Sequence, residues 1–169
     1  MFKRIQKISH ALSQLNLRFD LPIKRKIILF DDQHSSILKE IVNKDFNILY
    51  IREKKQIYFW ILLKQIIFFN FNFMTYCKNY IKYTSPKIVI TFIENNIQFY
   101  ELKNSFSDIH FIAVENGLRG NEFFKSKRIQ KSKKLKCDHI FVYNKHLLKK
   151  YEKIIKSNFH ILGSFKNNL

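Results

Sequence analysis

The sequence predicts an α/β domain in which a mostly parallel sheet is flanked by helices, and three observations lead to this class. Six short runs are rich in β-branched and aromatic residues, as strands are. Segments of helical length alternate with them, which is the pattern of βαβ units. The runs are mostly apolar rather than alternating, which is typical of parallel strands that are buried on both faces. Right-handed crossovers between such strands give a doubly wound, Rossmann-like sheet, expected over residues 24–169.

The strands are justified in chain order by the place where each apolar run stops. The first run ends at Asp31 and Asp32, the third at Glu94, the fourth at Glu115 and the sixth at Gly163. Polar residues that follow parallel strands lie along the carboxyl edge of the sheet, where open α/β sheets bind their ligands. The expected strands are residues 26–30, 46–51, 88–93, 111–114, 138–143 and 159–162.

Helices are expected between the strands, where apolar residues recur at steps of three and four. The longest is predicted to end before Pro86, because proline cannot extend a helix and restrains the residue before it. Ser35 or Ser36 is available to cap the first helix, and an asparagine at 95 or 96 to cap the third. The helical segments are residues 37–42, 58–83, 97–106 and 147–155, preceded by a basic, weakly helical lead-in at residues 1–23.

Composition limits the classes of function. The chain has 169 residues, of which 46% are hydrophobic, so it is long enough for one folded domain and is not disordered. Its net charge of +18 points to nucleic acid or to an anionic membrane. However, AT-rich coding also produces an excess of Lys, Asn, Ile, Phe and Tyr. Cys77 and Cys137 lack metal or redox spacing and indicate reduced thiols in a cytoplasmic protein.

Targeting signals and common catalytic motifs are missing. The basic start lacks the apolar core of a secretory signal, and polar residues interrupt the apolar segment 57–73 too often for a spanning helix. With glycine only at 117, 120 and 163, neither G-x-G-x-x-G nor a Walker A loop is possible, and no G-x-S-x-G elbow occurs. The histidines lack metal-ligand spacing. We therefore expect neither a metal nor an organic cofactor.

The sharpest local signal is Glu115-Asn116-Gly117. A strand that ends in Asn-Gly turns tightly, and Gly117 can take a positive φ, so one interpretation is a turn and nothing more. The functional interpretation directs Glu115 and Asn116 into the crevice, where they hydrogen-bond sugar hydroxyls or orient an acceptor. Arg119 would then supply a bidentate contact to an anion. Glu94 is the matching candidate on the preceding strand, as a base or as a ligand for a hydroxyl.

A basic tract follows in residues 125–136. The simpler interpretation is a solvated loop, and the alternative is contact with anionic lipid headgroups, where each Lys or Arg contributes about 1 kcal/mol. The tract has no interleaved aromatic residues, which argues against a platform for single-stranded nucleic acid. The candidate membrane contacts are Lys127, Arg128, Lys131, Lys133 and Lys134.

Four ordered motifs resemble bacterial surface carbohydrate (polysaccharide) biosynthesis proteins. They are the strand into Glu94-Asn95-Asn96, the strand into Glu115-Asn116-Gly117-Leu118-Arg119, residues 138–143, and the closing segment 163–168. The resemblance covers about residues 24–168. The family pattern has Gln-Asn-Gly where this chain has Glu115, and Asp-Asn where it has Glu94-Asn95. Both changes keep a polar side chain at the strand end.

The resemblance implies an architecture like that of the GT-B glycosyltransferases, with this chain matching only the amino-terminal, acceptor-side half. Glu94 and Glu115 become the candidate catalytic residues. The candidate substrate-binding residues are Asn95, Asn116, Gly117, Arg119, Gly163 and Ser164. The expected partner is a sugar or lipid-linked acceptor, with a nucleotide-sugar donor bound only together with a missing second domain.

On this hypothesis the chain is truncated or one part of a split protein, and it is not catalytic alone. It would be cytoplasmic and peripheral at the inner membrane, with no specific nucleic acid as a partner. Two rival hypotheses stay open. One is a basic Rossmann-like module that binds nucleic acid, and the other is a non-catalytic remnant whose interdomain face is exposed.

Overall fold

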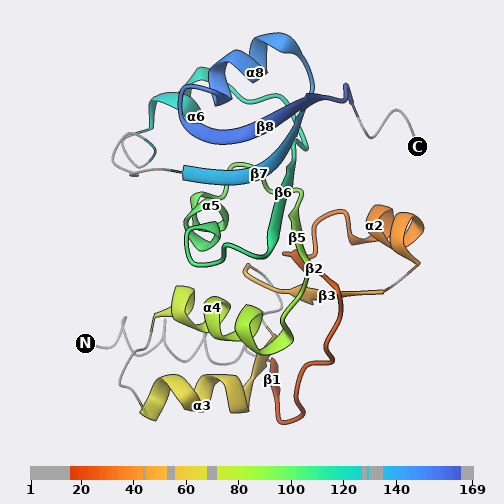
Figure 1. Ribbon diagram of the computed structural model, residues 1–169, viewed down its shortest axis with the longest axis vertical. Coiled ribbons are helices and arrows are strands. Elements are labelled where there is room, and N and C mark those ends of the chain that lie inside the picture. Colours follow the sequence, from red (N-terminus) through yellow and green to blue (C-terminus); the bar gives the residue numbers. More distant parts are fainter. Residues whose placement is uncertain are drawn as a thin grey trace, which may run out of the picture.

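The computed structural model describes residues 16–43, 45–52, 56–67, 72–126, 129 and 135–164. Its centre is a six-stranded sheet in the order β3-β2-β5-β6-β7-β8 (Figure 1), and every neighbouring pair is parallel. The strands are β2 (Ile27–Phe30), β3 (Phe46–Leu49), β5 (Ile88–Thr91), β6 (His110–Val114), β7 (Leu135–Val142) and β8 (Ile155–Ile161). The α/β, Rossmann-like class is confirmed, and so is each of the six predicted strands.

A second, two-stranded sheet was not predicted. β1 (Asn16–Arg18) pairs in parallel with β4 (Gln56–Tyr58). The end of the basic lead-in is therefore a strand rather than a weak helix. Each of these strands has three residues, and each depends on a partner far away in the chain. Such short pairing is decided by tertiary contacts more than by local preference.

The predicted helix over residues 58–83 is wrong as a single element. The structure has α3 (Phe59–Ile67) and α4 (Phe73–Thr84) in its place. Asn72 begins the second helix, because its side-chain oxygen accepts a hydrogen bond from the Met74 amide at 2.9 Å. The apolar periodicity continues across this cap, which explains why the sequence suggests one helix.

The remaining helices are α2 (Ser35–Val42), α5 (Ile97–Lys103), α6 (Asn121–Lys125) and α8 (Lys145–Tyr151). Asn96 caps α5 as expected, accepting from the Gln98 amide at 2.9 Å. The expected serine cap of α2 is wrong: His34 occupies the cap position in the left-handed region, with φ 56° and no side-chain cap bond. The short helix α6 lies in a segment predicted to be a loop.

The cap at Asn72 offers a direct stability test. We expect Asn72→Ala to lower the free energy of unfolding by about 1 kcal/mol, because it leaves an amide of the first turn of α4 unsatisfied. Asn79→Ala, inside the same helix, should be neutral or slightly stabilising, since alanine is the better helix former. Urea unfolding of both variants checks this. Equal losses would mean that the cap bond contributes nothing.

The two faces of the sheet are covered unequally (Figure 1). On one face, α4, α5 and α8 contribute Tyr80, Phe99 and Tyr151 to the larger hydrophobic core. On the other face, α2 packs through Leu38 against β2 and β3. An apolar hollow of about 350 Å³ remains between α2 and the neighbouring strands. α3 lies outside α4, in a further layer with β4.

Candidate functional site at the carboxyl edge of the sheet

The strand order places the point where the chain connections diverge between β2 and β5. The chain leaves β2 toward β3 on one side and later returns to β5 on the other, so the connections diverge at this point. Open α/β sheets bind ligands at the carboxyl ends of the strands beside such a divergence. The loops after β2, β5, β6 and β7 meet at this edge through the contacts described below.

Glu94, which follows β5, is fully buried and forms an ion pair with Arg119. Its other carboxylate oxygen, Oε2, accepts a hydrogen bond from the backbone amide of Asn116 at 3.1 Å. The hydrogen bond to Glu94 raises the pKa of Arg119, and about a quarter of the Arg119 side chain (24%) stays exposed. One carboxylate therefore holds the loop after β6 and directs a cation to the edge of the sheet.

Glu115, which follows β6, is also buried, with 2% of its surface exposed. Its Oε2 accepts from the Tyr143 amide at 2.8 Å, which ties the ends of β6 and β7 together. Its Oε1 is buried and has no hydrogen-bond partner in the described part of the chain. Burial raises the pKa of Glu115 to about 7, and the negative charge of Glu94 also raises it. The hydrogen bond from the Tyr143 backbone amide and the positive charge of Arg119 lower it in part. A carboxyl group that titrates near neutral pH is suited to proton transfer.

Tyr151 belongs to the same cluster. Its hydroxyl is buried and lacks a hydrogen-bond partner within the described residues, as Glu115 Oε1 does. Burial raises the pKa of Tyr151 strongly, the charges of Glu94 and Glu115 add to this, and the neighbouring Arg119 side chain opposes it. The sequence placed this tyrosine in the apolar stripe of a helix. A tyrosine in an apolar stripe is nevertheless a general signal. Its buried hydroxyl needs a polar partner, whereas an aliphatic side chain at the same position would not, so the tyrosine indicates a polar group nearby.

His34 links the loop after β2 to the cluster of Glu94, Asn116 and Arg119. Its Nε2 lies 2.6 Å from Asn116 Oδ1, so the loop after β2 is joined to the loop after β6 across the end of β5. Since the amide oxygen only accepts, Nε2 carries the proton in this arrangement. Both His34 and Asp31 have positive φ values, 56° and 78°. Strained backbone of this kind is concentrated at functional sites in proteins. No motif in the sequence singled out His34.

The loop after β2 contributes a separate ion pair. Asp31 is buried, and its two oxygens accept from Arg52 Nη2 at 2.8 Å and Nε at 3.0 Å. Burial pushes the pKa of Asp31 up, but the hydrogen bonds from Arg52 and with Asp32 outweigh it and hold the pKa below its ordinary value. The hydrogen bond with Asp31 raises the pKa of Asp32. The Asp31–Arg52 pair holds together the loops after β2 and β3 at the carboxyl edge of the sheet.

The other predicted site residues are placed less closely together. Asn95 is exposed beside Glu94. Gly117 does not use the left-handed region, so the expected positive φ at this turn is wrong, whereas Gly163 has φ 74°. Gly163 and Ser164 follow β8, two strands away from Glu115. The five candidate membrane contacts, Lys127, Arg128, Lys131, Lys133 and Lys134, lie outside the described residues.

Comparison with known proteins bears on the carboxyl half of this site. A family model described as "putative O-antigen biosynthesis protein" matches residues 112–169. This span holds Glu115, Asn116, Arg119 and Tyr151. The searches of curated proteins and of solved structures gave no match. The family match supports a role for this chain in the biosynthesis of surface polysaccharide.

Proposed function

We propose that this chain is the acceptor-side domain of a glycosyltransferase-like protein of surface polysaccharide biosynthesis. A second domain or chain would bind the nucleotide-sugar donor and complete the active site. The family match and the polar edge at the divergence of β2 and β5 support this proposal. The observation that carries it is the buried Glu115 carboxyl group, whose Oε1 has no hydrogen-bond partner within the described residues and whose pKa is raised by burial to about 7.

In the proposed reaction, Glu115 Oε1 takes the proton from an acceptor hydroxyl. The acceptor oxygen forms a bond to the anomeric carbon of the donor sugar, and the bond from that carbon to the nucleotide phosphate breaks. The phosphate leaves with the electron pair. Arg119 binds an anionic group of the acceptor, such as a lipid-linked phosphate. Glu94 acts through Arg119 and Asn116, so it is a positioning residue.

Access to Glu115 is part of this proposal. The carboxyl group is buried in the chain alone, so acceptor binding has to move the loop after β6. That loop is held through Asn116 and Arg119, both of which contact the same Glu94 carboxylate. The remaining polar edge, with Asn95, Gly163 and Ser164, would contact other hydroxyls of the acceptor or the donor domain.

Turnover in the completed protein tests the role of Glu115. In a reconstituted two-domain enzyme, we expect Glu115→Gln to reduce kcat at least about a hundredfold, which is typical for loss of a general base. Glu101→Gln, an exposed carboxylate on α5, is the control and should leave kcat unchanged. Circular dichroism should show that both variants fold. Unchanged turnover in Glu115→Gln would rule out the base assignment.

The net charge of +18 favours nucleic-acid binding as a second candidate, and it is tested separately. Duplex and single-stranded DNA are titrated against the chain at about 50 mM and 200 mM salt. If the attraction is only nonspecific, we expect the affinity to fall by about 10³-fold or more between the two concentrations. Tight binding that persists at the higher concentration would favour the nucleic-acid module over the acceptor-side domain.

A further inference from the structure

An exposed apolar surface is formed by α3 and by the segment that leads from β1 toward β2. It consists of Leu17, Phe19, Leu21, Ile23 and Trp60, whose exposed fractions are 39%, 63%, 48%, 65% and 49%. We call it the β1–α3 patch. Trp60 Nε1 donates to the Phe19 carbonyl at 2.7 Å, and the Phe59 ring lies 5.4 Å from both the Phe19 ring and the Trp60 ring. The two segments therefore meet in one exposed apolar surface, and such surfaces mark contacts with a protein partner or a membrane.

The composition of α3 points the same way. Only Lys64 and Gln65 in this helix are polar, and Gln65 is buried. A helix that is apolar on nearly every side is usually buried in a protein or in a membrane. Ile61 packs into the core below α3, and Trp60 faces outward. Within the described residues no helix has both the length and the apolar character needed to cross a bilayer, so a contact here would be superficial.

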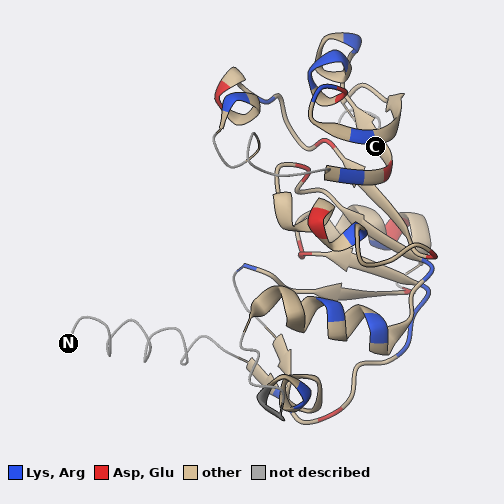
Figure 2. Ribbon diagram, turned by 60° about the vertical axis from the view of Figure 1, so that its left-hand side comes forward, with Lys and Arg blue, Asp and Glu red and all other residues tan. Residues whose placement is uncertain are grey.

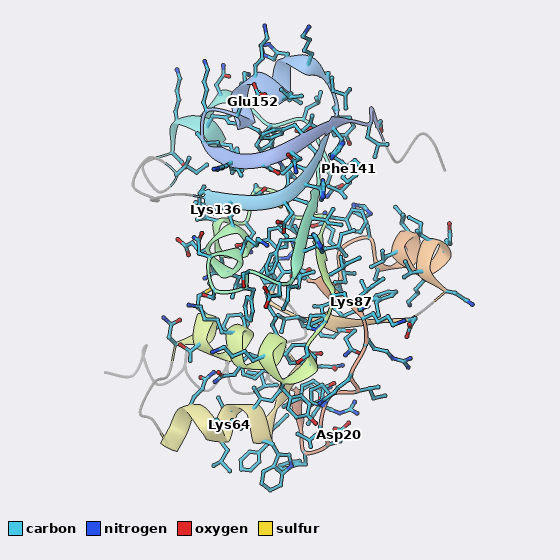
Figure 3. All side chains as sticks on the ribbon, in the orientation of Figure 1. Asp20, Lys64, Lys87, Lys136, Phe141 and Glu152 are labelled. Carbon is cyan, nitrogen blue, oxygen red and sulfur yellow. The ribbon has the colours of Figure 1, made fainter. Side chains whose placement is uncertain are left out.

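The charges around the patch are mostly positive. Lys24, Arg25 and Lys26 directly follow Ile23 and lead into β2, and Figure 2 shows Lys and Arg along the connection from β1 to β2 in blue. Of these three, Arg25 is paired with Asp45 at 2.7 Å. Lys64 and Asp20 lie at the same end of the molecule (Figure 3), and Asp20 is already paired with Arg18 at 2.7 Å. The surface is thus aromatic and aliphatic, and Lys24, Lys26 and Lys64 lie close to its residues in the chain.

This combination matches an anionic lipid surface. Trp and other aromatic rings are favoured at the headgroup level of a bilayer, and each nearby Lys or Arg contributes about 1 kcal/mol of attraction to anionic lipid. A second copy of the chain fits less well as the occupant. It would bring a further charge of +18 to the same interface, and the two like charges repel.

We infer that the β1–α3 patch is a membrane-contact surface that binds anionic phospholipid, with Trp60 and Phe19 at the headgroup level. This surface consists of other residues than the basic tract 125–136 of the sequence. The inference does not depend on the proposed glycosyltransferase role, since lipid binding is measured without donor or acceptor. Its failure would leave the assignment of Glu115 untouched, and the reverse also holds.

Trp60 provides the probe, because the chain has a single tryptophan. The full chain is titrated with vesicles of phosphatidylglycerol and phosphatidylcholine, and with vesicles of phosphatidylcholine alone. We expect the Trp60 emission to shift to shorter wavelength with the anionic vesicles only, and to return as salt is raised. Ile23→Ser should weaken the apparent affinity, and Phe19→Ser combined with Ile23→Ser should weaken it roughly tenfold or more, because apolar area is lost from the contact.

Ile41→Ser is the matched control. Ile41 on α2 is 66% exposed, against 65% for Ile23, so the two changes remove the same side chain at equal exposure. We expect the control to bind vesicles as the wild type does. Three results would overturn the inference: no binding to anionic vesicles, sedimentation with vesicles at unchanged Trp60 emission, or equal weakening by Ile41→Ser. An emission shift that grows with protein concentration without vesicles would instead assign the patch to self-association.

Discussion

Arg119→Met is expected to lower the free energy of unfolding by about 3–5 kcal/mol, because it leaves a buried carboxylate without its counter-charge. Glu94 has no exposed surface, and its two carboxyl oxygens are contacted by the Arg119 guanidinium and the backbone amide of Asn116. Methionine keeps much of the volume of arginine but provides no hydrogen-bond donor. The loss should appear as a lower midpoint in urea at an unchanged slope.

The two partners of this pair should not be equivalent. Glu94→Gln leaves Arg119 charged, but about a quarter of that side chain (24%) is exposed and can be hydrated. We therefore expect Glu94→Gln to cost less than Arg119→Met. The double variant should be more stable than Arg119→Met alone, since it removes the unpaired charge. If the double variant is instead the least stable of the three, the pair is not the source of the effect.

Arg25→Met is the control for removing an arginine. Arg25 pairs with Asp45 at 2.7 Å, but both side chains are largely exposed, at 41% and 54%. Exposed pairs of this kind contribute less than about 1 kcal/mol, because water and salt screen them. Arg119→Met and Arg25→Met both remove a positive charge, but only Arg119 pairs with a fully buried carboxylate. The difference between their losses of stability therefore measures the effect of that burial.

The sheet was predictable because its central strands are mostly apolar and stop at polar residues. Ile88 to Thr91 and His110 to Val114 illustrate this, since Glu94 and Glu115 follow each run almost at once. The helix over 58–83 was not predictable as two elements. Its apolar residues recur on both sides of Asn72, and only the side-chain bond of that residue shows where the second helix begins.

The candidate site was predictable in part. Polar residues at strand ends identified Glu94, Glu115, Asn116 and Arg119, and the structure brings these four together. Their partners were not predictable, because the pairing of Glu94 with Arg119 joins the ends of two strands through side-chain geometry. Tyr151 and His34 were missed for different reasons. One lies in an apolar helical stripe, and the other is an isolated histidine in a loop.

The Glu115 carboxyl group should make stability depend on pH in an unusual direction. Its pKa in the folded chain is about 7, against an ordinary value of 4.5, so folding favours the protonated form. The stabilising effect of protonation is complete below about pH 4.5, and it is lost as pH rises through 7. The full difference corresponds to about 3 kcal/mol. Stability from this group therefore falls between pH 4.5 and 8, whereas a paired carboxylate such as Asp31 destabilises the fold only in more acidic solution.

Glu115→Gln isolates this contribution. Glutamine cannot ionise, and its side-chain oxygen can still accept the hydrogen bond from the Tyr143 amide. We expect the variant and the wild type to have similar unfolding free energies near pH 4.5. At pH 8 the variant should be more stable by up to about 3 kcal/mol, because the wild type then carries a buried charge. Urea unfolding at several pH values measures the difference, in which the titration of all other groups cancels. A constant difference between pH 4.5 and 8 would show that Glu115 is ionised throughout, and it would remove the proton-transfer role together with the pH effect.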